Sequence, residues 1–178
     1  MTSYNPGSEI VASLLPPRSV GVEIGVYQGV SSARFLPKCK LLHLVDPWSL
    51  GAYPDKADFL TKYAHHIGGN TEDAAQRYFD AQHDSVARKF RGMPVKIHRM
   101  TSAQFFATFI GEVDWVYIDG LHDYDSVCAD IQGAFGIVKQ GGVIYGDDYG
   151  NKPGVARAVE EIAPYRELLG LKQYRIQC

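Results

Sequence analysis

Short apolar runs alternate along the chain with longer segments whose apolar residues recur at helical spacing. The runs span residues 20–24, 41–45, 95–100, 113–118 and 142–145, and each is too short to form a stable helix. They are rich in Val, Ile, Leu and Tyr, and several are apolar almost throughout, which is typical of strands buried on both faces of a parallel sheet. The pattern therefore predicts strands at these five places.

The intervening segments carry the apolar stripe of amphipathic helices. The longest candidates are residues 71–90 and 125–138, and shorter helices are expected over 31–36, 102–110 and 153–163. The C-terminus indicates two brief strands around Lys172 and Gln173. Strand–helix alternation of this kind predicts one α/β domain over residues 1–178, with a mostly parallel seven-stranded sheet, helices on both faces and a short C-terminal antiparallel hairpin.

Composition and charge narrow the function class. A chain of 178 residues with 46% hydrophobic residues and a formal charge of −2 is an ordinary globular domain, without the basic surface that nucleic acid or an anionic membrane requires. No apolar run approaches the roughly 20 residues of a membrane span, and no secretory signal is visible before Arg18. Cys39, Cys128 and Cys178 are odd in number and far apart, which favours a reducing, cytoplasmic setting.

A glycine-containing turn follows the first strand. Three residues separate Gly25 from Gly29, and Tyr27 stands where a dinucleotide-binding turn needs its second glycine to approach a pyrophosphate. Glu23 would repel a phosphate but attract an ammonium group, whereas the helix start at Ser31 suits a carboxylate. The turn therefore predicts a zwitterionic ligand without phosphate.

The second strand ends in Asp46, Pro47 and Trp48. An acidic residue about twenty positions after the glycine turn suits ribose hydroxyls, and Trp48 could lie against an adenine. An amino acid, a ribose and an adenine together make S-adenosylmethionine, which we expect as the cofactor.

Acidic residues follow the fourth and fifth strands. Asp119 ends one strand and Asp147 and Asp148 end the next, so the three carboxylates should converge at one sheet edge. Like charges that close are stable only with protons or a cation between them, and oxygen ligands favour Mg²⁺, Mn²⁺ or Ca²⁺ over zinc. The alternative is that Asp147 or Asp148 caps a turn or the helix near Pro153 and no metal binds.

Four segments resemble class I S-adenosylmethionine-dependent methyltransferases, which have a Rossmann-like fold. They are EIGVYQGVSS, the VDPW strand end, VYIDGLHDY and GGVIYGDDY, and they are most similar to the metal-dependent O-methyltransferases of the catechol and macrocin types. The resemblance spans residues 20–149. It implies Glu23 and Ser31 beside the methionine part of the donor, Asp46 on the ribose and Ser102 near the adenine. Ser102 could equally be the N-cap of its helix.

His122 lies three residues after Asp119, where the catechol-type enzymes have a lysine that accepts the acceptor's proton. The resemblance implies Asp, Asp and Asn as metal ligands, and Asp148 replaces the last of these. We expect His122 to be the general base beside a divalent metal, with Asp119 also catalytic, because histidine titrates near neutral pH. Alternatively, His122 is a loop residue bonded to Asp123 or Asp125.

These residues predict an O-methyltransferase acting on a small-molecule hydroxyl, in a sugar, a glycoside, a phenol or a catechol. Two alternatives stay open: a nicotinamide-dependent oxidoreductase on the same sheet, and a non-catalytic S-adenosylmethionine-binding module. Residues 49–92 are longer than a simple strand connection and should include an insertion that covers the acceptor. A second subunit is the other source of acceptor contacts, so a homodimer is one arrangement that would complete the site.

Overall fold

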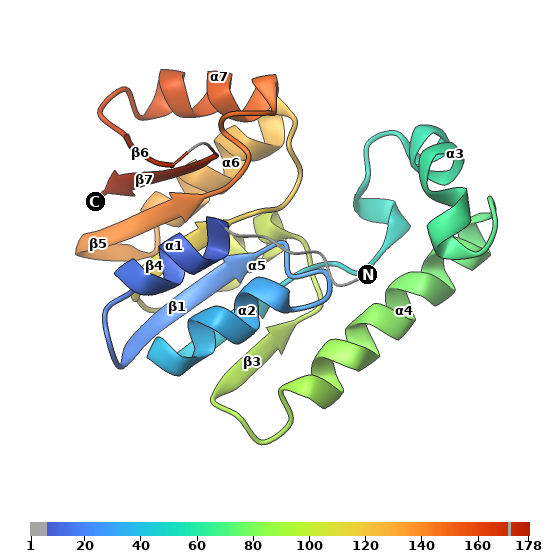
Figure 1. Cartoon of the computed structure of the whole chain (residues 1–178), viewed down its shortest axis with the longest axis horizontal. Helices are drawn as coiled ribbons and strands as arrows, with labels where there is room; N and C mark the ends of the chain where they lie inside the picture. Colours follow the sequence, from blue (N-terminus) through green and yellow to red (C-terminus); the bar gives the residue numbers. More distant parts are fainter. Residues whose placement is uncertain (1–6, 171) are drawn as a thin grey trace.

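Strands and helices alternate along the chain in the computed structural model, which describes residues 7–170 and 172–178 (Figure 1). Residues 1–6, part of the stretch in which no secretory signal is expected, lie outside the described residues. The strands are β1 (Ser19–Ile24), β2 (Cys39–Val45), β3 (Val95–His98), β4 (Val113–Ile118), β5 (Val138–Gly146), β6 (Glu167–Leu169) and β7 (Gln173–Gln177). The α-helices are α1 (Gly7–Leu14), α2 (Val30–Phe35), α3 (Lys56–Ile67), α4 (Glu72–Lys89), α5 (Ser102–Thr108), α6 (Tyr124–Phe135) and α7 (Pro153–Ile162); η1 (Leu36–Lys38) and η2 (Leu50–Ala52) are short 3₁₀ turns.

The strands form one sheet in the order β3-β2-β1-β4-β5-β7-β6. The first five are parallel, and β7 runs antiparallel to both β5 and β6. This confirms the expected mostly parallel seven-stranded sheet with its C-terminal antiparallel pair. Because the order reverses between β1 and β4, their carboxyl ends border the crevice where such sheets bind ligands.

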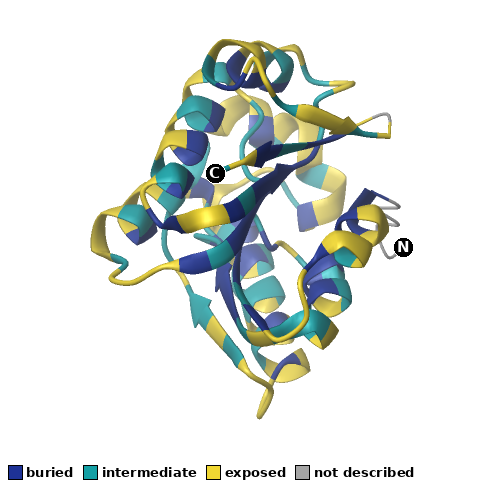
Figure 2. Ribbon diagram, turned by 90° about the vertical axis from the view of Figure 1, so that its left-hand side faces the viewer, coloured by how far each residue is buried: buried dark blue, intermediate teal, exposed yellow. Residues whose placement is uncertain are grey.

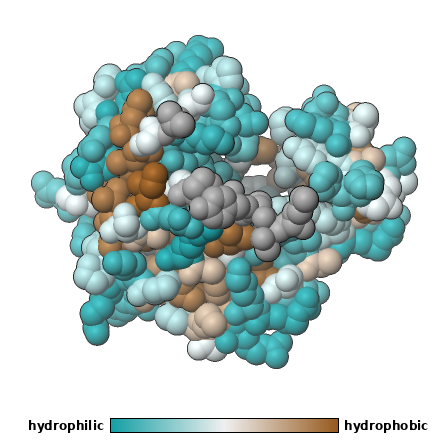
Figure 3. Space-filling view, viewed as in Figure 1, coloured by the Kyte–Doolittle hydropathy of each residue, from teal (hydrophilic) through white to brown (hydrophobic). Residues whose placement is uncertain are grey.

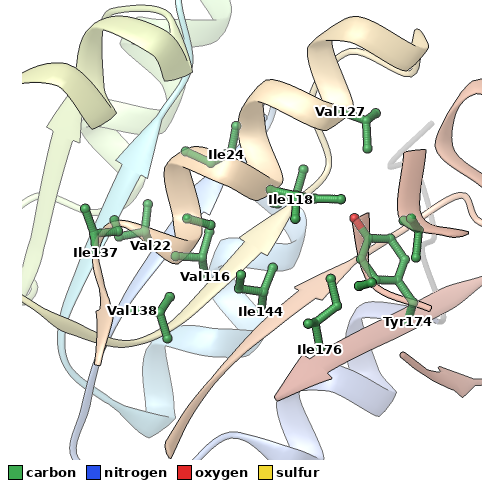
Figure 4. Packing of buried hydrophobic residues seen from close by; sticks show 14 of the residues in the cluster. Val22, Ile24, Val116, Ile118, Val127, Ile137, Val138, Ile144, Tyr174 and Ile176 are labelled. Atoms are coloured by element: carbon green, nitrogen blue, oxygen red, sulfur yellow. The ribbon is translucent and has the colours of Figure 1, made fainter. Parts of the chain in front are cut away.

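Two hydrophobic clusters cover the two faces of the sheet. One gathers α5, α6 and α7 against residues such as Val22, Val116 and Ile144 (Figure 4). The other gathers α1, α2, α3 and α4 against residues such as Leu44 and Trp115. The central strands are buried along most of their length (Figure 2), as the apolar runs in the sequence predict.

The segment between β2 and β3 contains two α-helices, α3 and α4, where the sequence pattern predicts only the second. α4 matches the expected helix closely, with Thr71 as its N-cap, and α3 precedes it. Both stand on the β3 side of the sheet in Figure 1, and in Figure 3 a hollow opens between the upper end of this segment and the part of the surface to its left. The insertion contributes aromatic residues to the second hydrophobic cluster, where Phe59 packs against Tyr53, Tyr63 and Phe79.

None of the helices in the described ranges, 7–170 and 172–178, has both the length and the apolar composition that a membrane span requires.

Candidate active site

The turn after β1 encloses a cavity at the crevice between β1 and β4. Gly25 has φ 85°, and a side chain there would place its Cβ 2.0 Å from the carbonyl oxygen of Asp119. The turn therefore needs glycine both for its left-handed backbone and for the close approach to the end of β4. A cavity of about 210 Å³ opens above it, and its lining residues are Gly25, Val26, Tyr27, Gln28, Val30, Ser31 and Asp119.

Glu23 is completely buried and is connected to this cavity through Ser31, which lines it. Its carboxyl group accepts hydrogen bonds from the hydroxyl groups of Ser31, at 2.5 Å, and of Ser32. Burial raises the pKa of Glu23 to about 8, although the two serine hydrogen bonds act in the opposite direction. A cation in the cavity would favour the ionised form, which agrees with the expected place of an ammonium group.

Asp46 follows β2 and holds the turn from the side. Its Oδ2 accepts hydrogen bonds from the backbone N–H groups of Val26 at 3.0 Å and Tyr27 at 2.9 Å, and its Oδ1 accepts one from Trp48 N at 2.7 Å. The carboxylate retains lone pairs beyond these three bonds, so the structure is compatible with an additional ribose contact.

The structure corrects the expected role of Trp48. Its ring is 1% exposed, its Nε1 donates to the carbonyl oxygen of Tyr27 at 3.0 Å, and its edge packs against His83. Trp48 thus belongs to the hydrophobic core and offers no open ring face to an adenine. Gly29 likewise has a packing role, because a Cβ there would lie 2.8 Å from the Phe90 ring.

Tyr27 is the aromatic residue that does face the cavity. It has φ 50°, is 42% exposed, and its hydroxyl group pairs with that of Tyr78 on α4. The phenol pair connects the turn to the insertion. From the sequence, Tyr78 is one of several aromatic residues of the insertion expected to cover the acceptor, and its pairing with Tyr27 was not predicted.

Ser102 lies at the start of α5, after β3, but it is not the N-cap. Thr101 caps the helix in a reciprocal capping box with Gln104. The Ser102 hydroxyl instead lies at Asp130 of α6, a 4% exposed carboxyl group whose pKa is raised to about 6 by burial. Asp130 was not predicted as a site residue. Its position beside the apolar stripe of α6 could have indicated it, because a carboxyl group is rarely buried unless it has a partner.

Three side chains meet at the carboxyl ends of β4 and β5, and we call them the Asp–His–Asp cluster: Asp119, His122 and Asp148. One potential ligand atom from each lies within 4.8 Å of the other two. Nε2 of His122 is 3.1 Å from Asp148 Oδ2 and 3.9 Å from Asp119 Oδ1. Within residues 7–170 and 172–178, His122 is the one ion-pair partner of Asp119 and Asp148. Asp148 enters the cluster because its backbone turns at φ 64°.

Asp147, expected as a metal ligand, has a different role. Its Oδ1 accepts hydrogen bonds from Gln173 Nε2 at 2.6 Å and Asp148 N at 2.7 Å, and its Oδ2 accepts one from Tyr117 at 3.1 Å. It is 7% exposed and ties β4, β5 and β7 together. The structure therefore corrects the expected ligand set: the side chains that come together are those of the Asp–His–Asp cluster, and Asp147 instead accepts from the backbone N–H of the next residue in the turn.

The cluster touches the cavity through Asp119. Burial raises the pKa of Asp119 to about 6; the imidazole of His122 lowers it, and the negative charges of Asp147 and Asp148 raise it further. Asp119 lines the cavity whereas His122 does not. The pairing of His122 with Asp123 or Asp125 is not observed: Asp123 instead caps α6 by accepting from Ser126 N.

Comparison with known proteins places this geometry in a family. A family model described as a methyltransferase domain matches residues 22–149, which include the cavity and the Asp–His–Asp cluster. No curated protein matches the sequence.

Solved structures share the fold at low sequence identity. SMU.1697c from Streptococcus mutans, in complex with SAH, has a TM-score of 0.62 and 8% identity over 96% of this chain and 94% of its own. The N-methyltransferase NodS from Bradyrhizobium japonicum WM9, in complex with S-adenosyl-L-homocysteine, has a TM-score of 0.62 and 12% identity over 98% and 89%. An rRNA methylase from Streptococcus thermophilus has a TM-score of 0.58 and 11% identity over 99% and 97%.

Proposed function

The chain belongs to the methyltransferase-domain family, and on that premise we propose that it moves the methyl group of S-adenosylmethionine to a hydroxyl oxygen of a small molecule with the help of a divalent cation. One observation carries the proposal: Asp119 belongs both to the cavity at the glycine turn and to the Asp–His–Asp cluster. A methyl donor in the cavity and an acceptor at the cluster would therefore be neighbours.

The residues around the cavity suit S-adenosylmethionine. The turn lacks the glycine that a pyrophosphate needs, and the buried Glu23, hydrogen-bonded to the cavity-lining Ser31, would attract an ammonium group in the cavity by its charge. Asp46 would accept hydrogen bonds from the ribose. A cavity of about 210 Å³ is smaller than the roughly 300–1,000 Å³ of whole ligand pockets, so it would enclose only the amino-acid part of the donor.

The Asp–His–Asp cluster fits a divalent cation. Two carboxylates and an imidazole are common metal ligands. Nε2 of His122 is buried and has no hydrogen-bond partner among the described residues, a condition that a bound ion would relieve. Such a cation would supply Lewis acidity, which lowers the pKa of a hydroxyl group and makes it a better nucleophile.

The chain's own residues would then align the reactants. The methyl group passes from sulfur to oxygen, the electron pair of the broken bond stays on sulfur, and the hydroxyl proton leaves. The sequence assigns that proton to His122, but the Lewis acidity of the cation also allows solvent to take it, so the proposal does not depend on His122 as a base.

The acceptor would bind between the cluster and the insertion. Tyr27 lines the cavity and pairs with Tyr78 of the insertion, and their phenol groups would suit a sugar, a glycoside or a phenol. Cytoplasmic location, and a homodimer that completes the acceptor site, stay predictions.

Calorimetry followed by an acceptor screen tests this function. We expect the protein to bind S-adenosylmethionine and not a nicotinamide dinucleotide, and to methylate oxygen in a screen of catechols, glycosides and hydroxylated metabolites read by mass spectrometry. Methylation of nitrogen, as in NodS, would contradict the choice of oxygen. Donor binding without turnover on any acceptor would support the non-catalytic binding module instead.

A further inference from the structure

His122 is the member of the Asp–His–Asp cluster whose position is hardest to explain without a ligand. Its Nε2 atom is shielded from solvent and, among the described residues, makes no hydrogen bond. Asp148 Oδ2 is only 3.1 Å away, so the ring nitrogen is near the carboxylate but is not aligned with it as a donor. A buried nitrogen that lies 3.1 Å and 3.9 Å from two carboxylate oxygens, without the alignment of a hydrogen-bond donor, is arranged as a ligand atom would be.

The spacing of the three ligand atoms agrees with coordination by one ion. Two ligand atoms bound at right angles to an ion at about 2.1 Å are about 3.0 Å apart, and two opposite ones about 4.2 Å. The separations from Nε2, 3.1 Å to Asp148 and 3.9 Å to Asp119, fall in this interval. Asp147 is not a member of this group of ligand atoms, and its two oxygens accept three hydrogen bonds from neighbouring residues.

The backbone around His122 is held in place by its neighbours. A Cβ at Gly154, in the first turn of α7, would lie 2.5 Å from the His122 carbonyl oxygen, so this helix packs directly on the loop. On the other side Asp123 caps α6. The imidazole is therefore carried by a fixed stretch of chain, as a preorganised ligand should be.

We infer that His122 binds the metal through Nε2, that it is not the proton acceptor, and that the site prefers a first-row transition-metal ion such as Mn²⁺ to Mg²⁺. The inference rests on the proposed metal site. An imidazole nitrogen among the ligands shifts preference away from Mg²⁺, which favours oxygen, toward ions that accept nitrogen. The all-oxygen ligand set expected from the sequence gave no reason for this preference.

Manganese binding to the complete chain tests the inference independently of turnover. The free Mn²⁺ signal in electron paramagnetic resonance gives the dissociation constant, and a pulsed experiment on the loaded protein detects coupling to a ligand nitrogen. We expect a histidine nitrogen coupling that changes on ¹⁵N-histidine labelling, and that His122→Ala abolishes. We expect the same variant to weaken Mn²⁺ binding by at least about tenfold. His65→Ala, which removes an exposed histidine on α3, is the matched control and should leave both unchanged.

A second variant tests the metal preference. His122→Asp restores an all-oxygen ligand set, so the ratio of the Mg²⁺ to the Mn²⁺ dissociation constant should fall by about tenfold or more. Bound Mn²⁺ without nitrogen coupling, or an unchanged dissociation constant in His122→Ala, would overturn the inference even if methyl transfer depends on metal. Conversely, nitrogen coupling in a protein that transfers no methyl group would support the ligand and refute the proposed function.

Discussion

Glu23 lets the chemistry of the donor cavity be tested through protein stability. Its carboxyl group is completely buried and has a pKa of about 8, against an ordinary value of 4.5. The folded protein therefore holds a proton that the unfolded chain releases, so the contribution of Glu23 to stability is present below pH 4.5 and is lost as the pH rises toward 8. Glu23→Gln keeps the shape and the hydrogen-bonding capacity but cannot ionise.

The magnitude follows from the size of the pKa shift. At about 1.4 kcal/mol per pKa unit, the window from 4.5 to about 8 corresponds to roughly 4–5 kcal/mol, most of it between pH 5 and pH 8. Urea unfolding of the wild type and Glu23→Gln at several pH values measures it. The wild type should lose about 3 kcal/mol relative to the variant between pH 5 and pH 8. Parallel stability curves over that interval would refute the reasoning, because they would mean that Glu23 is already ionised in the folded protein.

Three further predictions concern the turn, the edge of the sheet and the ribose position. Gly25→Ala should cost at least about 2–3 kcal/mol of unfolding free energy and abolish donor binding, since its Cβ meets a carbonyl oxygen. Gly68→Ala is the control: Gly68 also has a left-handed backbone, with φ 73°, but has open space around it. Its substitution should lower the unfolding free energy by only about 1 kcal/mol, measured by urea unfolding of both variants. His43 forms a 2.9 Å hydrogen bond with His98, and burial lowers its pKa to about 4. Stability should therefore fall by about 2 kcal/mol as the pH drops from 6.5 toward 4, and His43→Phe should remove that slope in chemical unfolding. Asp46→Ala should weaken S-adenosylmethionine binding about 10–100-fold in calorimetry, whereas Asp55→Ala, which removes only the cap of α3, should leave it unchanged.

The parallel core of the fold could be predicted because its strands are buried on both faces. Apart from α3, the strands and helices from residue 19 onward lie close to their expected positions, and the differences are mainly at the ends. β5 begins at Val138, four residues before the predicted strand, and the exposed residues 139–141 hid this early start because they interrupt the apolar pattern. Two helices were missed. α1 has only eight residues, whereas α3 is bounded by Asp55 and Gly68, cap residues that the sequence displays.

The site was predictable as far as strand ends determine it. Parallel pairing brings Gly25, Asp46 and Asp119 to one edge, since each directly follows its strand. What the sequence could not determine is which of two adjacent aspartates faces the cluster. Asp147 turns toward Gln173 while the left-handed backbone of Asp148 redirects its side chain, and both are aspartates with the same local propensity. The burial of Trp48 depends in the same way on contacts from a distant segment, α4.

Metal-dependent methyl transfer to oxygen is the central claim, and one assay tests it most directly. The protein is stripped of metal with a chelator and incubated with S-adenosylmethionine and the acceptor found by screening, with and without added Mn²⁺ or Mg²⁺. We predict that the O-methylated product, measured by mass spectrometry, disappears on stripping and returns with the cation. Full transfer to oxygen by the rigorously stripped protein would contradict the claim.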